Sequence, residues 1–212
     1  MNVMLRAASQ ADASAIHFLV TANVETGHLL PRTIDEIVER ISRFVVAELD
    51  GDVVGCAELA RLSPTVAEVR SLVVAESLRG QRIGTRLVSE LASKATSAGY
   101  ASLCAFTHDP SHFVKLGFTI VPHIWMPEKI AHDCTACPLF RRCGQYAVTL
   151  PLRAGVHVGP EAPPAVIYGG RNVAPRRPHI ERLHLQSVDP VAPVPQAIPA
   201  CERSSRRTST AA

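Results

Sequence analysis

Residues 69–87, VRSLVVAESLRGQRIGTRL, contain the stretch that decides the fold. An apolar run ending at Val74 is followed by a loop with two glycines, and this loop leads into the amphipathic run 84–98. The order predicts a strand, a loop and a helix. Free N–H groups at a helix start, together with the helix dipole, bind phosphate without needing a particular side chain. We therefore expect a phosphate site, to which Arg79 and Arg82 add positive charge.

The rest of the first 150 residues alternates between strand and helix patterns. A helix is expected after the cap at Ser9, and a second one after the capping box Thr33–Glu36. Asp50-Gly51 tolerates positive φ and predicts a tight hairpin turn. Strands are expected at 3–5, 44–49, 53–59, 66–74, 101–106, 118–121 and 146–150, and a further short helix at 111–116. The order βααβββαβαββ predicts an α/β domain with a mixed sheet and helices on both faces.

Composition divides the chain at residue 150. Ten of the sixteen prolines lie in 151–212, which carries eight Lys+Arg against four Asp+Glu and shows no sustained period. We predict a folded domain at 1–150 and a disordered Pro/Arg-rich tail at 151–212. The domain has 14 basic and 15 acidic residues, which argues against nucleic-acid binding. The start shows no secretory pattern and no segment has the length of a membrane span, so a cytoplasmic protein without a membrane partner is expected.

A cysteine cluster lies near the end of the predicted domain. His132, Cys134, Cys137 and Cys143 offer three thiols and one imidazole within twelve residues, in principle enough for tetrahedral zinc. Only one Cys-x-x-Cys pair is present, and thiols in a reducing compartment also pack as small apolar side chains. The second interpretation is the favoured one, and zinc is kept only as a weak alternative.

Two motifs resemble those of the GNAT acetyltransferases. Arg79-x-x-x-x-Gly84 after the strand ending at Val74 resembles the family's Arg/Gln-x-x-Gly-x-Gly/Ala motif, with Arg82 in place of the middle glycine. The loop is expected to accept that substitution only if Arg82 keeps a negative φ. Phe113-Val-Lys-Leu-Gly117-Phe resembles the later aromatic-x-x-x-Gly-Phe segment. The resemblance implies the GNAT fold, a mostly antiparallel sheet flanked by helices, and acetyl-CoA as co-substrate.

A narrower resemblance covers residues 1–150. The segments are Gly27-His-Leu-Leu-Pro-Arg32, Phe44-Val-Val-Ala-Glu48, Val54-Gly-Cys-Ala57, Ala67-Glu-Val-Arg-Ser-Leu72 and Asp133-Cys-x-x-Cys-Pro-x-Phe-x-x-Cys143. Together they are similar to stand-alone amino-acid N-acetyltransferases of the N-acetylglutamate synthase type. This implies acetyl transfer to the α-amine of L-glutamate, as in arginine biosynthesis, with a homodimer left open. The alternatives are another small amine as acceptor, or a non-catalytic acyl-CoA-binding module.

The same resemblance assigns the coenzyme A contacts. The pantetheine arm would pair with Leu72, Val73 and Val74, and the backbone N–H of Val73 would face the thioester carbonyl as oxyanion donor. The pyrophosphate would lie on the loop formed by Arg79, Gly80, Gln81, Arg82, Ile83, Gly84 and Thr85.

Acceptor binding and proton transfer have their own candidates. An amine with a pKa of about 8 to 10 must lose a proton, and Glu68 is the candidate base, with a water chain ending at Ser71 or His108 as the alternative. Phe113 stands where the family often has a tyrosine acid, so that role is vacant. Arg32 and Arg70 are the candidate cations for the acceptor's carboxylates, with Ser71 beside them.

Overall fold

The computed structural model describes residues 2–24, 29–137 and 139–156, and most of the predicted tail, from residue 157 onward, lies outside them. The strands are β1 (Met4–Ala7), β2 (Phe44–Leu49), β3 (Asp52–Arg61), β4 (Val66–Val74), β5 (Ser102–Thr107), β6 (Thr119–Val121) and β7 (Tyr146–Pro151). The helices are α1 (Ala13–Ala22), α3 (Ile34–Glu39), α4 (Ile83–Ser97), α5 (Ser111–Lys115) and α6 (Pro127–Lys129). Short 3-10 helices cover Gln10–Asp12, Ile41–Arg43, Glu76–Leu78, His123–Trp125 and Phe140–Arg142, and η5 (Ile130–Cys134) is a π-helical turn.

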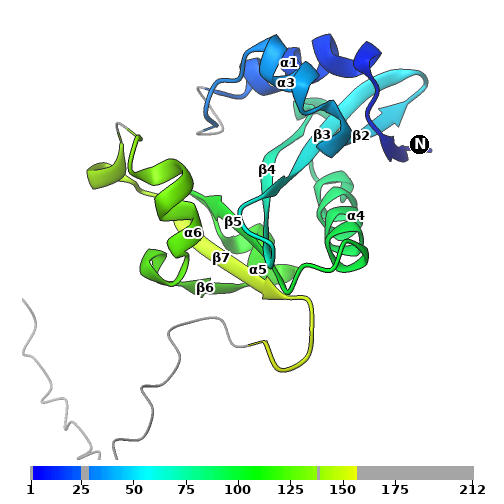
Figure 1. Ribbon diagram of the computed structural model, residues 1–212. Helices are drawn as coiled ribbons and strands as arrows, with labels where there is room; N and C mark the ends of the chain where they lie inside the picture. Colours follow the sequence, from blue (N-terminus) through cyan, green and yellow to red (C-terminus); the bar gives the residue numbers. More distant parts are fainter. Residues whose placement is uncertain (1, 25–28, 138, 157–212) are drawn as a thin grey trace, which may run out of the picture. The chain divides into compact units, whose positions relative to one another are not determined.

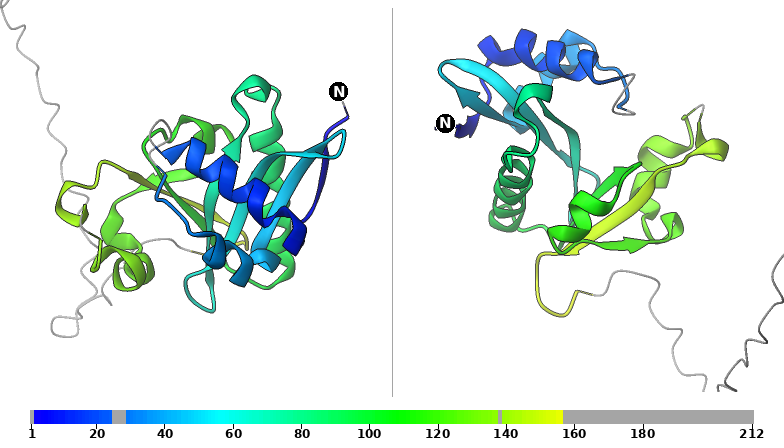
Figure 2. Two further views of the ribbon diagram at one scale, coloured as in Figure 1. Left: turned by 90° about the horizontal axis from the view of Figure 1, so that it is seen from above. Right: turned by 180° about the vertical axis from the view of Figure 1, so that it is seen from behind.

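Seven strands form one mixed sheet in the order β1-β2-β3-β4-β5-β7-β6. Every neighbouring pair is antiparallel except β4 and β5, which run parallel. Figures 1 and 2 show α1 and α3 on one face of β2 to β4, and α4 on the other. The predicted α/β fold and the order of its strands and main helices are confirmed.

Alternation along the strands builds a core on each face. In β2, Val45 and Ala47 pack toward α4, whereas Phe44 and Val46 pack toward α1 and α3. This is the period of two that a strand buried on both faces requires. Asp50 and Gly51 both have positive φ, as a tight hairpin turn between β2 and β3 demands. The predicted hairpin is therefore present.

The sheet opens between β4 and β5. Their parallel pairing runs from Val66 with Ser102 to Val69 with Ala105 and then stops, although β4 continues to Val74. Within β4, Ser71 has a φ of 48° and the register against β3 shifts by one residue, which marks a β-bulge. Figure 1 shows the two strands diverging beyond their paired ends. The last residues of β4 therefore have no partner strand on the side of β5.

Residues 122–134, to which the sequence analysis assigned no element, form a chain of short helical turns. Pro122 and Pro127 begin two of them, and η5 follows directly after α6. Met126 is buried here beside Cys104 and Ala147. At the end of the domain, β7 extends to Pro151 and the N–H of residue 152 donates to the carbonyl of residue 101. These first residues past 150 therefore pack on the sheet.

One expectation about the phosphate loop was wrong. Arg82 does not keep a negative φ: it has φ 61° and ψ 14°, the left-handed conformation, and serves as N-cap of α4. Its carbonyl accepts the first helical hydrogen bond, from the N–H of Arg86 at 3.0 Å. A glycine would adopt this geometry without the steric cost that a Cβ brings. The loop therefore has the backbone conformation that suits a glycine, and Arg82 is strained in it.

Replacing this residue is expected to stabilise the fold. Arg82→Gly removes about 1–2 kcal/mol of strain from the left-handed conformation. Glycine also makes the unfolded chain more flexible, which offsets part of this gain, so the free energy of unfolding should rise by about 0.5–1 kcal/mol. The measurement is the urea midpoint without coenzyme A. Arg82→Ala is the matched control, because it removes the same charge but keeps the strain. Equal midpoints for the two variants would contradict the prediction.

Candidate active site

A cleft of about 830 Å³ opens where β4 and β5 diverge. Its walls come from the end of β4, the end of β5, the chain at 29–32, and the segment 129–137 after β6. Of the predicted site residues, it brings together Arg32, Glu68, Arg70, Ser71, Leu72, Val73, Val74 and Arg79, and Cys137 also lines it. Residues 80–85 of the phosphate loop do not line the cleft.

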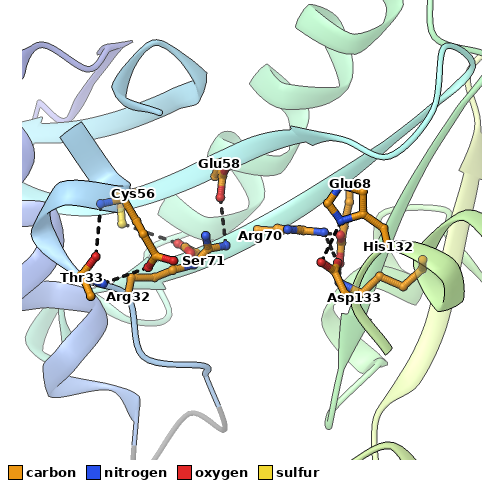
Figure 3. Close-up of polar contacts among 11 residues, drawn as sticks. Arg32, Thr33, Cys56, Glu58, Glu68, Arg70, Ser71, His132 and Asp133 are labelled. Atoms are coloured by element: carbon orange, nitrogen blue, oxygen red, sulfur yellow. Dashed lines mark hydrogen bonds and ion pairs between the residues drawn. The ribbon is translucent and has the colours of Figure 1, made fainter. Parts of the chain in front are cut away.

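A largely buried ion-pair network lines the cleft, and Figure 3 shows part of it. Arg70 donates from Nε to Oε2 of Glu68 at 2.5 Å and from Nη2 to Asp133. Lys129 Nζ lies 2.6 Å from Oε1 of Glu68 and 2.9 Å from Oδ2 of Asp133. Each oxygen of Glu68 is thus held by a different cation. Two positive and two negative charges balance, which allows such burial.

Electrostatic interactions keep Arg70 and Asp133 ionised. Burial lowers the proton affinity of Arg70, but the charges of Glu68 and Asp133 outweigh it and raise the pKa of Arg70. Burial raises the pKa of Asp133, but hydrogen bonds from Lys129 and His132 outweigh it and lower that pKa to about 2. Both groups therefore carry full charge at neutral pH.

Lys129 and Asp133 were missed in the sequence analysis. They lie 61 and 63 residues from their strand partners, on turns that show no periodic pattern. The sequence did hold one signal for this pair: Lys129 and Asp133 are four residues apart, as in a helical ion pair, and Pro127 just before them is typical of a helix start.

A second buried carboxylate forms an ion pair with Arg32. Glu58 on β3 is fully buried, and its Oε2 accepts a hydrogen bond from Nη2 of Arg32 at 3.1 Å. Its other oxygen has no partner among the described residues. Arg70 lies opposite Glu58 on β4. Glu58 was also missed, although a glutamate that shares a strand face with Cys56 and Ala60 signals a paired, buried charge.

The strand-loop-helix unit places a free helix start beside the cleft. No described side chain caps α4, so the N–H groups of its first turn remain available to an anion. A Cβ at Gly84 would lie 3.6 Å from His112 and 3.8 Å from Val74, two residues that line the cleft. Ile83 is buried in the core, so that residue offers only its backbone. The Arg79 side chain binds the Val74 carbonyl and Asn23.

His112 is another residue that the sequence analysis did not single out. It lines the cleft, and its Nε2 is buried without a hydrogen-bond partner among the described residues. Burial lowers its pKa, so the ring is neutral at pH 7. A buried nitrogen without a partner next to a free helix start fits a polar ligand that extends from the cleft to α4.

The backbone of β4 corrects the assignment of Val73. The Val73 carbonyl oxygen points toward β3, since it would lie 3.0 Å from a Cβ atom built on Gly55. The Ala75 N–H also points toward β3 and donates to the carbonyl of Val54. Because the backbone groups of alternate residues point to the same edge of a strand, Leu72 and Val74 face the opening instead. The Val73 N–H is therefore turned away from the cleft.

Residues 12–118 match the acetyltransferase (GNAT) family. An uncharacterized N-acetyltransferase of Chlorobaculum tepidum is 33% identical over 151 residues, which cover 71% of this chain and 97% of that protein. The chain belongs to the GNAT acetyltransferase family. It is therefore an acetyl-CoA-dependent acetyltransferase, as its two motifs predicted.

Two longer relatives are amino-acid acetyltransferases by name. The amino-acid acetyltransferase of Shewanella oneidensis is 34% identical over 127 residues, which cover 59% of this chain and 28% of that protein. The N-acetylglutamate synthase of Neisseria gonorrhoeae, solved with coenzyme A and N-acetyl-glutamate, is 25% identical with a TM-score of 0.65, over 72% of this chain and 36% of that one. This GNAT chain thus matches only about a third of the length of either protein.

Several features of this GNAT domain bear on the remaining expectations. Phe113 packs edge-on against Phe118 with ring centroids 5.2 Å apart and offers no proton to a leaving thiolate.

The five cysteines within the described ranges are free thiols, and burial raises the pKa of Cys56 to about 12. No cluster of three or more His, Cys, Asp or Glu in those ranges is arranged to hold a metal. None of the helices described is long and apolar enough to cross a bilayer.

Proposed function

We propose that this enzyme transfers the acetyl group of acetyl-CoA to the α-amine of an amino acid, and that L-glutamate is its preferred acceptor. The observation that carries the proposal is the set of three cations, Arg32, Arg70 and Lys129, in the walls of the cleft beside the open end of β4. An acceptor with two carboxylates needs two cationic contacts, and arginine binds a carboxylate through two parallel hydrogen bonds. The names of the relatives support the same class of acceptor.

Acetyl-CoA is proposed to bind along the opening. Its pantetheine would extend along β4, where Leu72 and Val74 present their backbone, and its pyrophosphate would lie on the N–H groups at the start of α4. The N–H groups of Leu72 and Val74, rather than that of Val73, are then the donors for the thioester oxygen. A backbone donor is fixed before charge develops, which is what stabilises an oxyanion.

Glu68 remains the proposed proton acceptor. Four carboxylates line the cleft, and Glu68 is the one on the strand that also carries Leu72 and Val74. It lies about 13 Å along the strand from Leu72, at roughly 3.3 Å per residue, so a water relays the proton. The freed amine attacks the thioester carbon, the C–N bond forms and the C–S bond breaks. The nitrogen then loses its second proton to water as the thiolate leaves, and the thiolate takes up a proton from water, since Phe113 supplies none.

An acceptor panel tests the proposal. Acetyl-CoA-dependent thiol release is measured with the purified chain across free amino acids and simple polyamines. We expect kcat/KM for glutamate to exceed that for glutamine at least tenfold, because only glutamate offers a second carboxylate to the cations. Turnover of polyamines alone would refute the amino-acid acceptor, and coenzyme A binding without turnover of any amine would refute it too, because that result is expected of a non-catalytic acyl-CoA-binding module.

A further inference from the structure

Arg70 and Lys129 are already shared by two carboxylates of the chain itself. Glu68 and Asp133 each pair with both cations, and the right half of Figure 3 shows the two carboxylates next to each other at the guanidinium end of Arg70. Lys129 reaches Oδ2 of Asp133 at 2.9 Å, and the same oxygen accepts from Arg70. A carboxylate bound between an arginine and a lysine is the arrangement that an acidic acceptor would need.

The two carboxylates differ in how firmly they are held. The Glu68 side chain is 3% exposed and projects from a central strand, whereas the Asp133 side chain is 30% exposed and projects from the single π-helical turn η5. A π-helical turn is a less stable backbone than a strand inside a sheet. Removing Asp133 from the cations therefore requires a much smaller rearrangement than removing Glu68.

Charge balance favours the replacement of the Asp133 carboxylate by another carboxylate over its removal without replacement. With Asp133 in place, two cations face two anions, and without it one positive charge stays uncompensated in a partly buried site. The side-chain carboxylate of an acceptor restores the balance. His132 Nδ1 lies 3.0 Å from Oδ1 of Asp133 and its side chain is 57% exposed, so a displaced Asp133 keeps a partner near solvent.

We propose that Asp133 occupies the place of the acceptor's side-chain carboxylate, and that an acidic acceptor binds by displacing it from Arg70 and Lys129. Asp133 is then a specificity-determining residue: it competes with acidic acceptors and sets how much of one is needed. The inference rests on the proposed amino-acid acceptor. If Asp133 only held Arg70 in place, its removal would weaken acidic ligands, which is the opposite result.

The test compares Asp133→Asn with the wild-type chain, using two readouts. The first is the ratio of kcat/KM for glutamate over glutamine, which is expected to rise about tenfold because Asn is a weaker competitor for the cations. Asp52→Asn, an exposed carboxylate at the start of β3, is the control and should leave the ratio as it is. A lower ratio in Asp133→Asn would overturn the proposal.

The second readout does not depend on catalysis. Glutarate carries two carboxylates and no amine, and calorimetric titration in the presence of coenzyme A measures its Kd. Asp133→Asn is expected to bind glutarate about tenfold more tightly than wild type. Unchanged or weaker binding would reject the displacement even if no amino acid is ever turned over. Asp133→Ser repeats the titration if the Asn variant does not fold.

Discussion

Arg70→Ala is expected to lower kcat/KM for glutamate by at least a hundredfold. The change removes a charged contact to the acceptor and leaves Glu68 and Asp133 with a single cation between them. Two charge-assisted hydrogen bonds contribute about 3 kcal/mol or more, which corresponds to that factor. Most of the loss should appear as a higher KM. Steady-state thiol release with glutamate as the varied acceptor measures it.

Two variants show whether the effect belongs to the site. Arg43→Ala removes an exposed arginine that does not line the cleft, and it should keep wild-type kinetics. Arg70→Lys retains the charge but loses the planar fork, and it should fall between wild type and Arg70→Ala. Breaking a buried pair also costs about 3–5 kcal/mol of stability, so unfolding is measured beside activity. A KM for glutamate that stays at the wild-type value in a folded Arg70→Ala would exclude Arg70 from acceptor binding.

Glu68→Gln is expected to lower kcat for glutamate by about a hundredfold or more, since a positioned base contributes roughly 10² to 10⁴. The amide keeps the shape of the side chain and one acceptor oxygen, but it cannot take a proton. Raising the pH above about 9 deprotonates part of the free amine, so the variant should regain activity there relative to wild type. A pH–rate profile for both proteins is the measurement.

The pH profile separates proton transfer from positioning. If Glu68 only holds Arg70 and Lys129, the variant should show a higher KM for glutamate and no recovery at high pH. Glu39→Gln, which changes an exposed carboxylate on α3, is the control for the loss of one negative charge. A water chain ending at Ser71 or His108 would be favoured by a kcat within threefold of wild type.

The fold was predictable from local patterns because its main elements have strong periods. The capping box at Thr33 and Glu36 is present in the structure, with both of its hydrogen bonds. The predicted run 84–98 forms α4, which starts one residue before that run, ends at Ser97 and buries Leu87 and Leu91 against the sheet. Such signals depend only on neighbours a few residues apart.

The site was only partly predictable because its contacts join distant parts of the chain. Arg32 and Arg70 were found from the resemblance, but their partners Glu58 and Asp133 lie 26 and 63 residues away from them. The left-handed Arg82 could not be foreseen either, since sequence alone does not show how much strain the surrounding loop imposes. Pairing between remote charges is decided by the sheet order, which no local window contains.

The opening between β4 and β5 also bears on the lifetime of the protein. The last residues of β4 have no neighbouring strand on one side, and acetyl-CoA bound as proposed would pair with them there. Ligand that binds only the folded chain adds about 2.7 kcal/mol of stability at a concentration a hundredfold above its Kd. The fraction of chains that unfold and reach proteases falls accordingly. If acetyl-CoA binds along β4 as proposed, we expect the abundance of the protein to rise with the supply of its acetyl donor.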